Sequence, residues 1–301
     1  MMMTDLPTTP TPSAEEITDV LFNQLLKVMG LKRSNWLSWL LFFILSAPIR
    51  KMSTIVVELD RNIANKGFHT AVTQFMGYFI ANTQIHGAEA IPQTGPLMVV
   101  CNHPAATDIL LLIASIRRDD LKVLASDISI IQKLPNIAEH SIPVPYHIPS
   151  RLQTVRRVIQ HLNSGGAILL FPRGDVEPDP TVSPGAEESL AGWSPSIELF
   201  LRRVPQTITV VAIASGVLSK KWFNNPLFRL WKKYEQRQKV AEIFQITSQL
   251  LTGKMPKSTP MINFSVPLTM DDLGGKNSPE GTLFVNLIEQ ARYLLAQHPH
   301  V

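Results

Sequence analysis

Short apolar runs alternate with amphipathic segments between Gly87 and Pro267. Runs of four to eight mainly apolar residues predict strands, here at Leu97–Cys101, Lys122–Ala125, Ala167–Phe171, Thr207–Ala214 and Met261–Val266. Segments with helical spacing predict helices near 108–117, 150–162, 194–203 and 280–296. This alternation of strands and helices is typical of an α/β sheet domain.

The first apolar segment has a different character. No acidic residue occurs in residues 20–57, and basic residues flank the uncharged stretch Ser34–Ile49, which is rich in Trp, Leu and Phe. As a helix these 16 residues would extend about 24 Å, less than the ~30 Å hydrocarbon core of a bilayer, and Pro48 interrupts their end. We therefore expect a helix that lies in the membrane interface, with Trp36 and Trp39 at headgroup level. A buried core helix is the alternative.

Three regions follow from these patterns. Residues 1–19 are expected to form a disordered tail, because they hold few large apolar side chains that could offset the entropy lost on ordering. Residues 20–84 are expected to form a helical membrane-associating region, and residues 85–301 the α/β domain. Acidic residues precede the first apolar run, where a secretory signal is basic, so we expect no cleavable export signal.

Composition and charge narrow the class of protein. The net charge of +4 at pH 7 is too small to indicate a nucleic-acid partner unless the charge is clustered. The one cysteine, Cys101, cannot form an internal disulfide, and no Cys/His spacing typical of a zinc site occurs. We therefore expect no metal, and a location on the cytoplasmic face of a membrane, where thiols stay reduced.

One charge cluster does stand out. Between Lys220 and Lys239 seven basic residues face a single acid, Glu235, and aromatic residues are interleaved with them. Phosphates of nucleic acid or an anionic bilayer would both suit such a segment. Together with Ser34–Ile49 the cluster favours membrane lipids as the partner and no nucleic acid. The alternative is a solvated basic helix whose aromatic side chains pack inward.

Polar groups capable of catalysis follow the strand that ends at Cys101. Asn102, His103 and Asp108 come at its carboxyl end, the edge of an open α/β sheet where ligands bind. A neutral histidine accepts a proton near pH 7, and a carboxylate partner would fix its tautomer and stabilise the imidazolium. We therefore predict His103 as a general base with Asp108 as the group that orients it.

Two alternatives concern the same residues. Asp108 or Thr107 could instead cap the helix that begins at Ile109, accepting a backbone N–H. Cys101 could form an acyl-enzyme with His103 as its base, but its side chain is expected to point into the sheet, where a cysteine is usually inert. A reaction in which the acceptor attacks the acyl donor directly, without an acyl-enzyme, is therefore favoured. No G-x-S-x-G, Walker loop or G-x-G-x-x-G occurs.

Asn102-His103 followed by Asp108 resembles the NHxxxxD signature of the glycerolipid acyltransferases, the lysophosphatidate acyltransferase-like group. Phe171–Asp175, which begins 68 residues after His103, resembles the third block of that family, F-P-E-G-T. The resemblance covers roughly residues 85–220 and implies a single mixed sheet flanked by helices. It also implies direct attack by the acceptor, with no cofactor beyond the acyl-CoA or acyl-carrier-protein co-substrate.

Two further segments resemble blocks of the same family and occur in the family's order. The stretch Ile142–Arg151 stands in the place of the second block, whose arginine is thought to hold the phosphate of the acceptor, and Arg151 is the best match. Val210–Gly216 resembles the fourth block but lacks its usual proline. The resemblance thus makes Asn102, Arg151, Arg173 and Gly174 candidate substrate-binding residues.

The third block departs from the family pattern, since Arg173 replaces its glutamate and Asp175 and Val176 replace its threonine and arginine. A bidentate arginine binds phosphate well, so Arg173 could take over anion binding. The change also allows an acceptor without a phosphate monoester, or a member without activity. Alternatively, Arg173 forms an ion pair with an acid of its own loop: Asp175, Glu177 or Asp179.

These observations together predict an O-acyltransferase that is similar to the 1-acylglycerol-3-phosphate acyltransferases. It would move a fatty acyl group from an acyl-CoA or acyl-carrier-protein thioester to the hydroxyl of a lysolipid acceptor at the membrane. A non-catalytic, membrane-docked lipid-binding member of the same fold is the alternative. A thioesterase that uses His103 with water is the third hypothesis.

Overall fold

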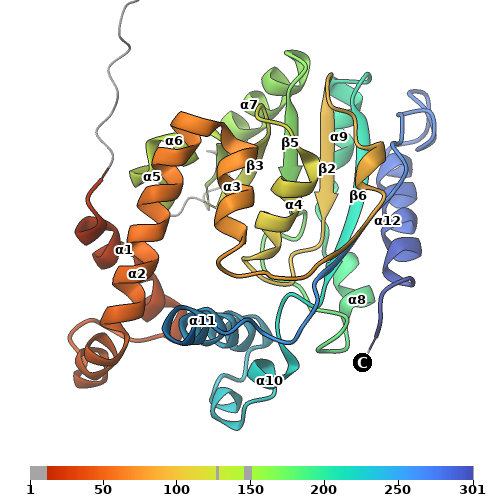
Figure 1. Cartoon of the computed structure of the whole chain (residues 1–301). Coiled ribbons are helices and arrows are strands. Elements are labelled where there is room, and N and C mark those ends of the chain that lie inside the picture. Colours follow the sequence, from red (N-terminus) through yellow and green to blue (C-terminus); the bar gives the residue numbers. More distant parts are fainter. Residues whose placement is uncertain (1–11, 127–128, 146–150, 301) are drawn as a thin grey trace, which may run out of the picture.

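A computed structural model describes residues 12–126, 129–145 and 151–300 of the chain (Figure 1). Its centre is one seven-stranded sheet with the order β1-β7-β6-β2-β5-β3-β4. The strands are β1 (Gln84–His86), β2 (Leu97–Cys101), β3 (Lys122–Ser126), β4 (Ser141–Val144), β5 (Ala167–Leu170), β6 (Ile208–Ser215) and β7 (Met261–Phe264). β6, β2, β5, β3 and β4 are parallel, whereas β7 is antiparallel to β6 and β1 is parallel to β7. The predicted single mixed sheet flanked by helices is therefore confirmed.

Helices cover both faces of this sheet (Figure 1). One face packs against α2 (Trp36–Lys66), α3 (Phe68–Met76) and α4 (Asp108–Ile116), and the other against α7 (Arg151–Asn163), α8 (Ala186–Leu190), α9 (Ser196–Arg203) and α12 (Thr282–Leu295). Alternate residues of β2 enter opposite cores: Val99 and Cys101 the first, Met98 and Val100 the second. Burial on both faces is the reason that the strands are continuous apolar runs.

All five predicted strands and all four predicted helices are present, with each end within two residues of its predicted position. Sequence patterns missed β1 and β4, which form the two edges of the sheet. β1 has three residues, all exposed, and β4 has one buried residue in four. Short edge strands carry no apolar run, so the hydrophobic pattern does not identify them.

The predicted disordered tail is too long at its C-terminal end. α1 (Ala14–Met29) includes residues 14–19. A capping box begins it: Ser13 accepts from the backbone N–H of Glu16, and the Glu16 carboxylate accepts from the backbone N–H of Ser13. Ile17 and Phe22 are buried, so the apolar face of α1 supplies the burial that the tail was expected to lack. Residues 1–11 lie outside the described part of the chain.

The predicted break at Pro48 is also wrong, because α2 continues through this residue to Lys66. Its 31 residues extend about 46 Å, so the argument that the segment is too short to span a bilayer does not hold. Among the described residues α2 is the one helix long and apolar enough to cross a membrane by length and composition, and 33% of its most apolar window is buried in the protein.

The N-terminal half of α2 has one exposed apolar face, formed by Trp36, Trp39, Leu40, Phe43 and Ile44. These positions follow the i, i+3, i+4, i+7, i+8 spacing of a single helical stripe. Trp36 is 75% exposed and Phe43 82% exposed. The buried-core alternative therefore does not apply to this face, which is called the α2 apolar face below.

The remaining helices are η1 (Ala88–Ala90), α5 (Ser129–Lys133), α6 (Pro135–Glu139), α10 (Lys220–Phe223), η3 (Pro226–Leu230) and α11 (Tyr234–Thr252). α11 lies across the carboxyl edge of the parallel strands, and α10 lies beside it (Figure 1). α11 packs against α1 and α2, and its Ile243 contacts the hydrophobic cluster that contains Leu45. The basic segment is therefore part of the cover over this edge of the sheet.

Within the basic segment two phenylalanine side chains point inward. Phe223 and Phe228 are buried in a cluster with Val240 of α11, as the solvated-helix alternative predicted. Two leucines of η3 face solvent instead, Leu227 and Leu230, the second of which is 79% exposed. The outer surface of the segment thus combines basic side chains with two exposed leucines rather than with a row of aromatic rings.

Candidate active site

Three neighbouring strands, β5, β2 and β6, bring their carboxyl ends together at the edge covered by α11. The His103 loop (residues 102–107) follows β2, and the Arg173 loop (residues 171–185) follows β5. The two loops are joined directly, because the backbone N–H of Glu177 donates to the carbonyl oxygen of His103 at 2.7 Å. The adjacency of the parallel strands is what places the first and third sequence blocks side by side.

The predicted contact between His103 and Asp108 is present. Nδ1 of His103 lies 3.0 Å and 3.1 Å from the two carboxylate oxygens of Asp108. The Phe171 ring stacks against the imidazole with its centroid 4.2 Å away. Within the described residues Nε2 has no hydrogen-bond partner, and the side chain of His103 is 23% exposed. Since Asp108 occupies Nδ1, the free nitrogen is the one available to an incoming hydroxyl.

Electrostatics favour the charged form of His103. Burial lowers the pKa of His103. The negative charge of Asp108, the hydrogen bond to Asp108, and the charges of Glu242 and Glu177 together raise it by more than burial lowers it, so the pKa lies above the usual 6.5. The carboxylate of Asp108 is fully buried. A buried carboxylate at hydrogen-bond distance stabilises an imidazolium, which is the state that proton abstraction creates.

Asp108 does not serve as the cap that the alternative proposed. It is the first residue of α4, and the N-cap is Thr107, whose side chain makes no capping bond. One oxygen of Asp108 accepts from the backbone N–H of Ala105 at 3.2 Å and is also the closer of the two to His103. Asp108 therefore holds the His103 loop and the imidazole together.

Asn102, predicted to bind substrate, has another place. Its side chain is buried, its oxygen accepts from the backbone N–H of Ala214 at 2.7 Å, and its amide donates to the Ala214 carbonyl at 3.0 Å. Both polar atoms are thus used to fasten the end of β2 to β6. These bonds give Asn102 a structural role, and its contact with substrate stays a prediction.

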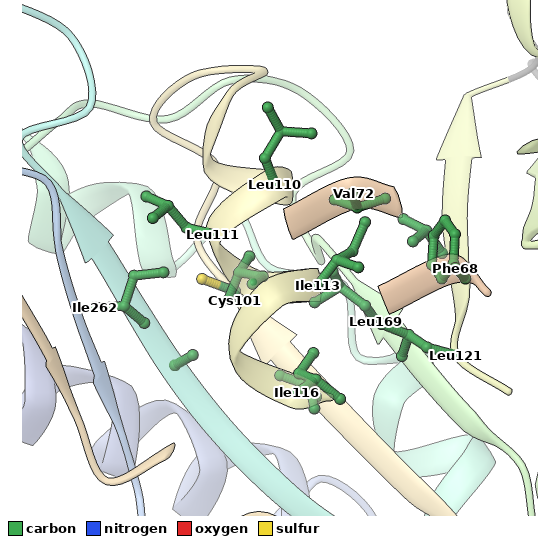
Figure 2. Close-up of a cluster of buried hydrophobic side chains, with 14 of the residues drawn as sticks. Phe68, Val72, Cys101, Leu110, Leu111, Ile113, Ile116, Leu121, Leu169 and Ile262 are labelled. Carbon is green, nitrogen blue, oxygen red and sulfur yellow. The ribbon is translucent and has the colours of Figure 1, made fainter. Parts of the chain in front are cut away.

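Cys101 lies in the apolar core beneath α4, with its sulfur among aliphatic side chains such as Leu111 and Ile113 (Figure 2). It is completely buried. Burial, followed by the charges of Asp108 and Glu177, raises the pKa of its thiol well above the usual value. The predicted inward orientation is therefore present, and a thiolate nucleophile at this position is disfavoured.

Arg173 forms an ion pair, but not with an acid of its own loop. Its guanidinium lies 3.2 Å from Glu235 at the start of α11, and both side chains are about one-third exposed or less. Asp175 is paired in the same way with Lys239 of α11 at 2.5 Å. The predicted partners Asp175, Glu177 and Asp179 are corrected, because α11 supplies the charges that meet this loop.

Gly174 lies between these two pairs with a φ of +73°, a left-handed conformation that glycine adopts without strain. Its backbone N–H donates to the carbonyl of Phe171 at 3.0 Å, which closes the turn. A Cβ at this position would meet no atom within 4 Å, so the space beside it is open. Gly174 thus gives the loop its turn and leaves room beside the two ion pairs.

Arg151 lies further away. It begins α7, after β4, and β4 is the third strand from β2. Three strand spacings of ~4.8 Å place it about 14 Å along the sheet. Its guanidinium is exposed and donates to the Pro145 carbonyl at 3.3 Å. The sheet therefore does not bring Arg151 next to His103, and its role in holding an acceptor anion stays a prediction.

The Arg173 loop contains two buried carboxylates that the sequence indicated only as possible ion-pair partners of Arg173. Asp179 accepts from the backbone N–H groups of Gly216 and Val217 at 3.0 and 3.1 Å, tying the loop to the end of β6. Glu177 accepts from Ser189 and from the indole N–H of Trp193 at 3.0 Å. Burial raises the pKa of Glu177 to about 7. Its other oxygen has no partner among the described residues.

α11 contributes two more residues that were not foreseen. Glu242 accepts from the backbone N–H groups of Ala106 and Thr107, and Gln238 donates to the Pro104 carbonyl and to the Glu177 carbonyl. Both side chains are buried. The contacts with residues 104–107 join positions more than 130 residues apart, and the contact with Glu177 joins positions 61 apart, so no local sequence signal could have indicated them. Among the described residues no group of three His, Cys, Asp or Glu side chains is arranged to hold a metal ion.

Comparison with known proteins gives three findings. No curated protein matches the sequence. Among solved structures, the 1-acyl-sn-glycerophosphate (LPA) acyltransferase PlsC from Thermotoga maritima is similar at 11% sequence identity with a TM-score of 0.47, over 93% of this chain and 98% of that chain. A family model described as Acyltransferase matches residues 82–191, the segment that contains His103, Asp108 and the whole Arg173 loop. This segment of the chain is therefore similar to the acyltransferase family.

Proposed function

We propose that this protein is an O-acyltransferase that transfers a fatty acyl group from a thioester to the hydroxyl of a lysolipid acceptor at a membrane surface. The observation that carries the proposal is the contact of His103 Nδ1 with both oxygens of the buried Asp108 carboxylate. The acyltransferase family of residues 82–191 supports the reaction class. The donor is an acyl-CoA or an acyl-carrier protein, and the acceptor is lysophosphatidate or a related lysolipid.

In the proposed reaction Nε2 of His103 removes the proton of the acceptor hydroxyl as its oxygen attacks the thioester carbonyl. Asp108 keeps the proton of Nδ1 in place and stabilises the imidazolium that forms. When the tetrahedral intermediate collapses, the carbon–sulfur bond breaks and the imidazolium returns its proton to the departing thiolate. The products are an ester and a free thiol, and no group on the enzyme is acylated.

Binding of an anionic acceptor is assigned to Arg173, with Gly174 leaving space beside it and Arg151 as a more distant contact. Arg173 already pairs with Glu235, and both side chains are partly exposed. An exposed ion pair is worth little, so a phosphate can replace Glu235 at small cost. An acceptor without phosphate would leave the pair intact, so the effect of Arg173 on different acceptors distinguishes the two classes.

The membrane contact is assigned to the α2 apolar face together with η3. The exposed rings and aliphatic chains of α2 and the exposed leucines of η3 would insert at the acyl boundary, while Lys32, Lys220 and Lys221 meet anionic headgroups. α2 and α11 are packed against each other, which ties this surface to the helix that covers His103. A lysolipid could then reach the site without crossing water. The cytoplasmic face is proposed because the sole cysteine is a free thiol.

One assay tests the proposed activity. Purified full-length protein in anionic vesicles is given acyl-CoA or acyl-carrier-protein donors and a panel of lysolipids, and both free thiol and acylated lipid are measured. We expect thiol release that depends on the acceptor and disappears in His103→Ala. Equal turnover by the wild type and this variant would refute the catalytic assignment. Free fatty acid without acceptor would indicate a thioesterase, and lipid binding without any turnover would indicate a non-catalytic member of the fold.

A further inference from the structure

Glu242 makes three hydrogen bonds to the His103 loop, although it lies outside residues 82–191, the segment that the acyltransferase family model matches. It lies in the middle of α11 and is 5% exposed. One carboxylate oxygen accepts from the backbone N–H of Ala106 at 2.9 Å. The other accepts from the backbone N–H of Thr107 at 3.0 Å and from its hydroxyl at 3.1 Å. Three donors of one loop therefore converge on one buried side chain.

These bonds lie directly ahead of α4. The N-cap residue Thr107 makes no side-chain capping bond, and Glu242 accepts from the backbone N–H groups of Thr107 and of the residue before it. A carboxylate next to a helix N-terminus also interacts favourably with the helix dipole. Since Asp108 is the first residue of this helix, whatever holds Thr107 also fixes the start of the segment that carries the partner of His103.

Gln238 supports the other end of the same loop. It precedes Glu242 by one turn on α11, and its amide donates to the Pro104 carbonyl and, at 2.9 Å, to the Glu177 carbonyl. Gln238 and Glu242, on one face of α11, thus hydrogen-bond the His103 loop on both sides of Ala105. His103 and Asp108 flank the residues that these bonds hold.

We infer that Glu242 is a positioning residue of the active site, which holds Ala106 and Thr107 so that His103 and Asp108 keep their contact. The inference rests on the proposed role of His103. It assigns part of the active site to α11, which lies outside the segment that the acyltransferase family model covers. Because α11 also packs against α2, the same helix joins the His103 loop to the proposed membrane surface.

The ionisable groups that act on His103 come from three elements: Asp108 from α4, Glu242 from α11 and Glu177 from the Arg173 loop. The charge of Glu242 raises the pKa of His103, although burial also raises the pKa of Glu242 itself. Replacing this carboxylate should therefore change both the position of the loop and the titration of His103. A residue with a merely structural role in α11 would change neither at a still-folded site.

The same contacts allow a rival explanation. Two adjacent N–H groups at a helix start can bind an anion, so Glu242 could occupy the place of a substrate phosphate or oxyanion and block it. The two explanations predict opposite results. Removal of a positioning carboxylate lowers activity, whereas removal of a blocking carboxylate raises it.

The test compares Glu242→Gln with the wild type and with Glu280→Gln, an exposed control in the loop before α12. Glutamine has nearly the same size but only one acceptor oxygen, so one N–H group of Ala106 or Thr107 loses its partner. Three quantities are measured in the full-length protein: kcat and kcat/KM against pH, the pKa of His103 by NMR of its ring, and hydrogen exchange of the Ala106 and Thr107 amides. Circular dichroism checks that each variant is folded.

For Glu242→Gln we expect kcat to fall about 100-fold, as a small misplacement of a catalytic group produces. The pKa of His103 and the acid limb of kcat/KM should move to lower pH, and the two amides should exchange faster than in the control. Should this variant fail to fold, Glu242→Asp retains the charge on a shorter side chain and should restore the pKa of His103 while leaving kcat reduced.

Three results would overturn the inference. One is a rise in activity, which would identify Glu242 as a blocking group. Another is an unchanged pKa of His103 with unchanged exchange of both amides. The third is an Asp variant with wild-type kcat, since correct placement would then not depend on the reach of Glu242. If the wild type has no acyltransferase activity, the proposed function fails, but NMR and hydrogen exchange still decide whether Glu242 positions the loop.

Discussion

Replacing Asp108 with asparagine tests the proposed catalytic pair most directly. The side chain keeps its size, and its oxygen can still accept from the Ala105 N–H, as Asp108 does at 3.2 Å. The new NH2 group then takes the position of the other oxygen, which lies 3.1 Å from Nδ1 of His103. Two donors would face each other there, so we expect the imidazole proton to move to Nε2 and the amide to donate to Nδ1. The base is then lost at the nitrogen that faces the acceptor.

The magnitude follows from the contacts that the substitution removes. General-base catalysis contributes about 10²- to 10⁴-fold to a rate, and we expect Asp108→Asn to lose most of this factor in kcat. At ~4 Å between charge centres and an effective dielectric constant of ~20, the attraction between imidazolium and carboxylate is about 4 kcal/mol, part of which offsets the burial of both groups. Its loss should lower the pKa of His103.

The direction of the pH effect follows from the role of His103 as a base. The base acts when His103 is neutral, so activity rises with pH through its pKa, which in the wild type lies above 6.5. Without the carboxylate the residual activity should show its acid limb at lower pH. The control is Asp19→Asn, which removes one partner of an exposed surface pair with Arg33. The assay is thiol release with a saturating lysolipid. A loss in kcat below about tenfold, or an acid limb that does not move, would refute the proposed pairing.

Three further predictions use the same protein. Cys101→Ala should leave kcat unchanged, because no acyl-enzyme forms on a fully buried thiol, while urea unfolding should show a cost of about 1 kcal/mol; an inactive but folded variant would support a thiolate mechanism. Arg173→Ala should raise KM about 10- to 100-fold for an acceptor that carries phosphate and leave KM for a neutral acceptor unchanged, since a charged hydrogen bond contributes ~1.5–3 kcal/mol; equal effects on both acceptors would contradict anion binding there. Replacing Trp36, Trp39 and Phe43 together by serine should lower partitioning into anionic vesicles at least about 100-fold, because inserting ~100 Å² of each ring contributes about 2.5 kcal/mol. In a flotation assay the matched control is Tyr293→Ser on α12, which is 66% exposed, and equal flotation of all three proteins would place the membrane surface elsewhere.

The sequence predicted the central strands well because burial on both faces requires continuous apolar residues. β2 is buried at all five positions, so Leu97–Cys101 was predicted with the correct ends. The course of α2 was not predictable from local rules. Pro48 removes one backbone hydrogen bond, but the helix retains its packing on both sides of it through Leu45 and Ile55.

The residues of the candidate site also differ in whether local sequence could predict them. His103 and Asp108 are close in sequence and lie on a strand end and the next helix, so a short motif can specify their contact. Asp179 and Glu242 accept from backbone groups of other loops, and Glu177 accepts from the side chains of Ser189 and Trp193. Any acid on a suitably placed helix or loop could make such contacts. Their identity depends on how β5, β6 and α11 meet, which the hydrophobic pattern does not encode.

The acids around His103 have two opposite effects on its action as a general base. Asp108, Glu177 and Glu242 together hold the pKa of His103 above its usual value, which reduces the neutral fraction available near pH 7. The same charges stabilise the imidazolium as the acceptor hydroxyl loses its proton, so they lower the barrier of the step for which the neutral base is required. Burial raises the pKa of Glu177 to about 7, so raising the pH through this value adds a negative charge beside the imidazole, which raises the pKa of His103 further. The acid limb of the pH profile should therefore be broader than that of one isolated histidine, and Glu177→Gln should make it steeper.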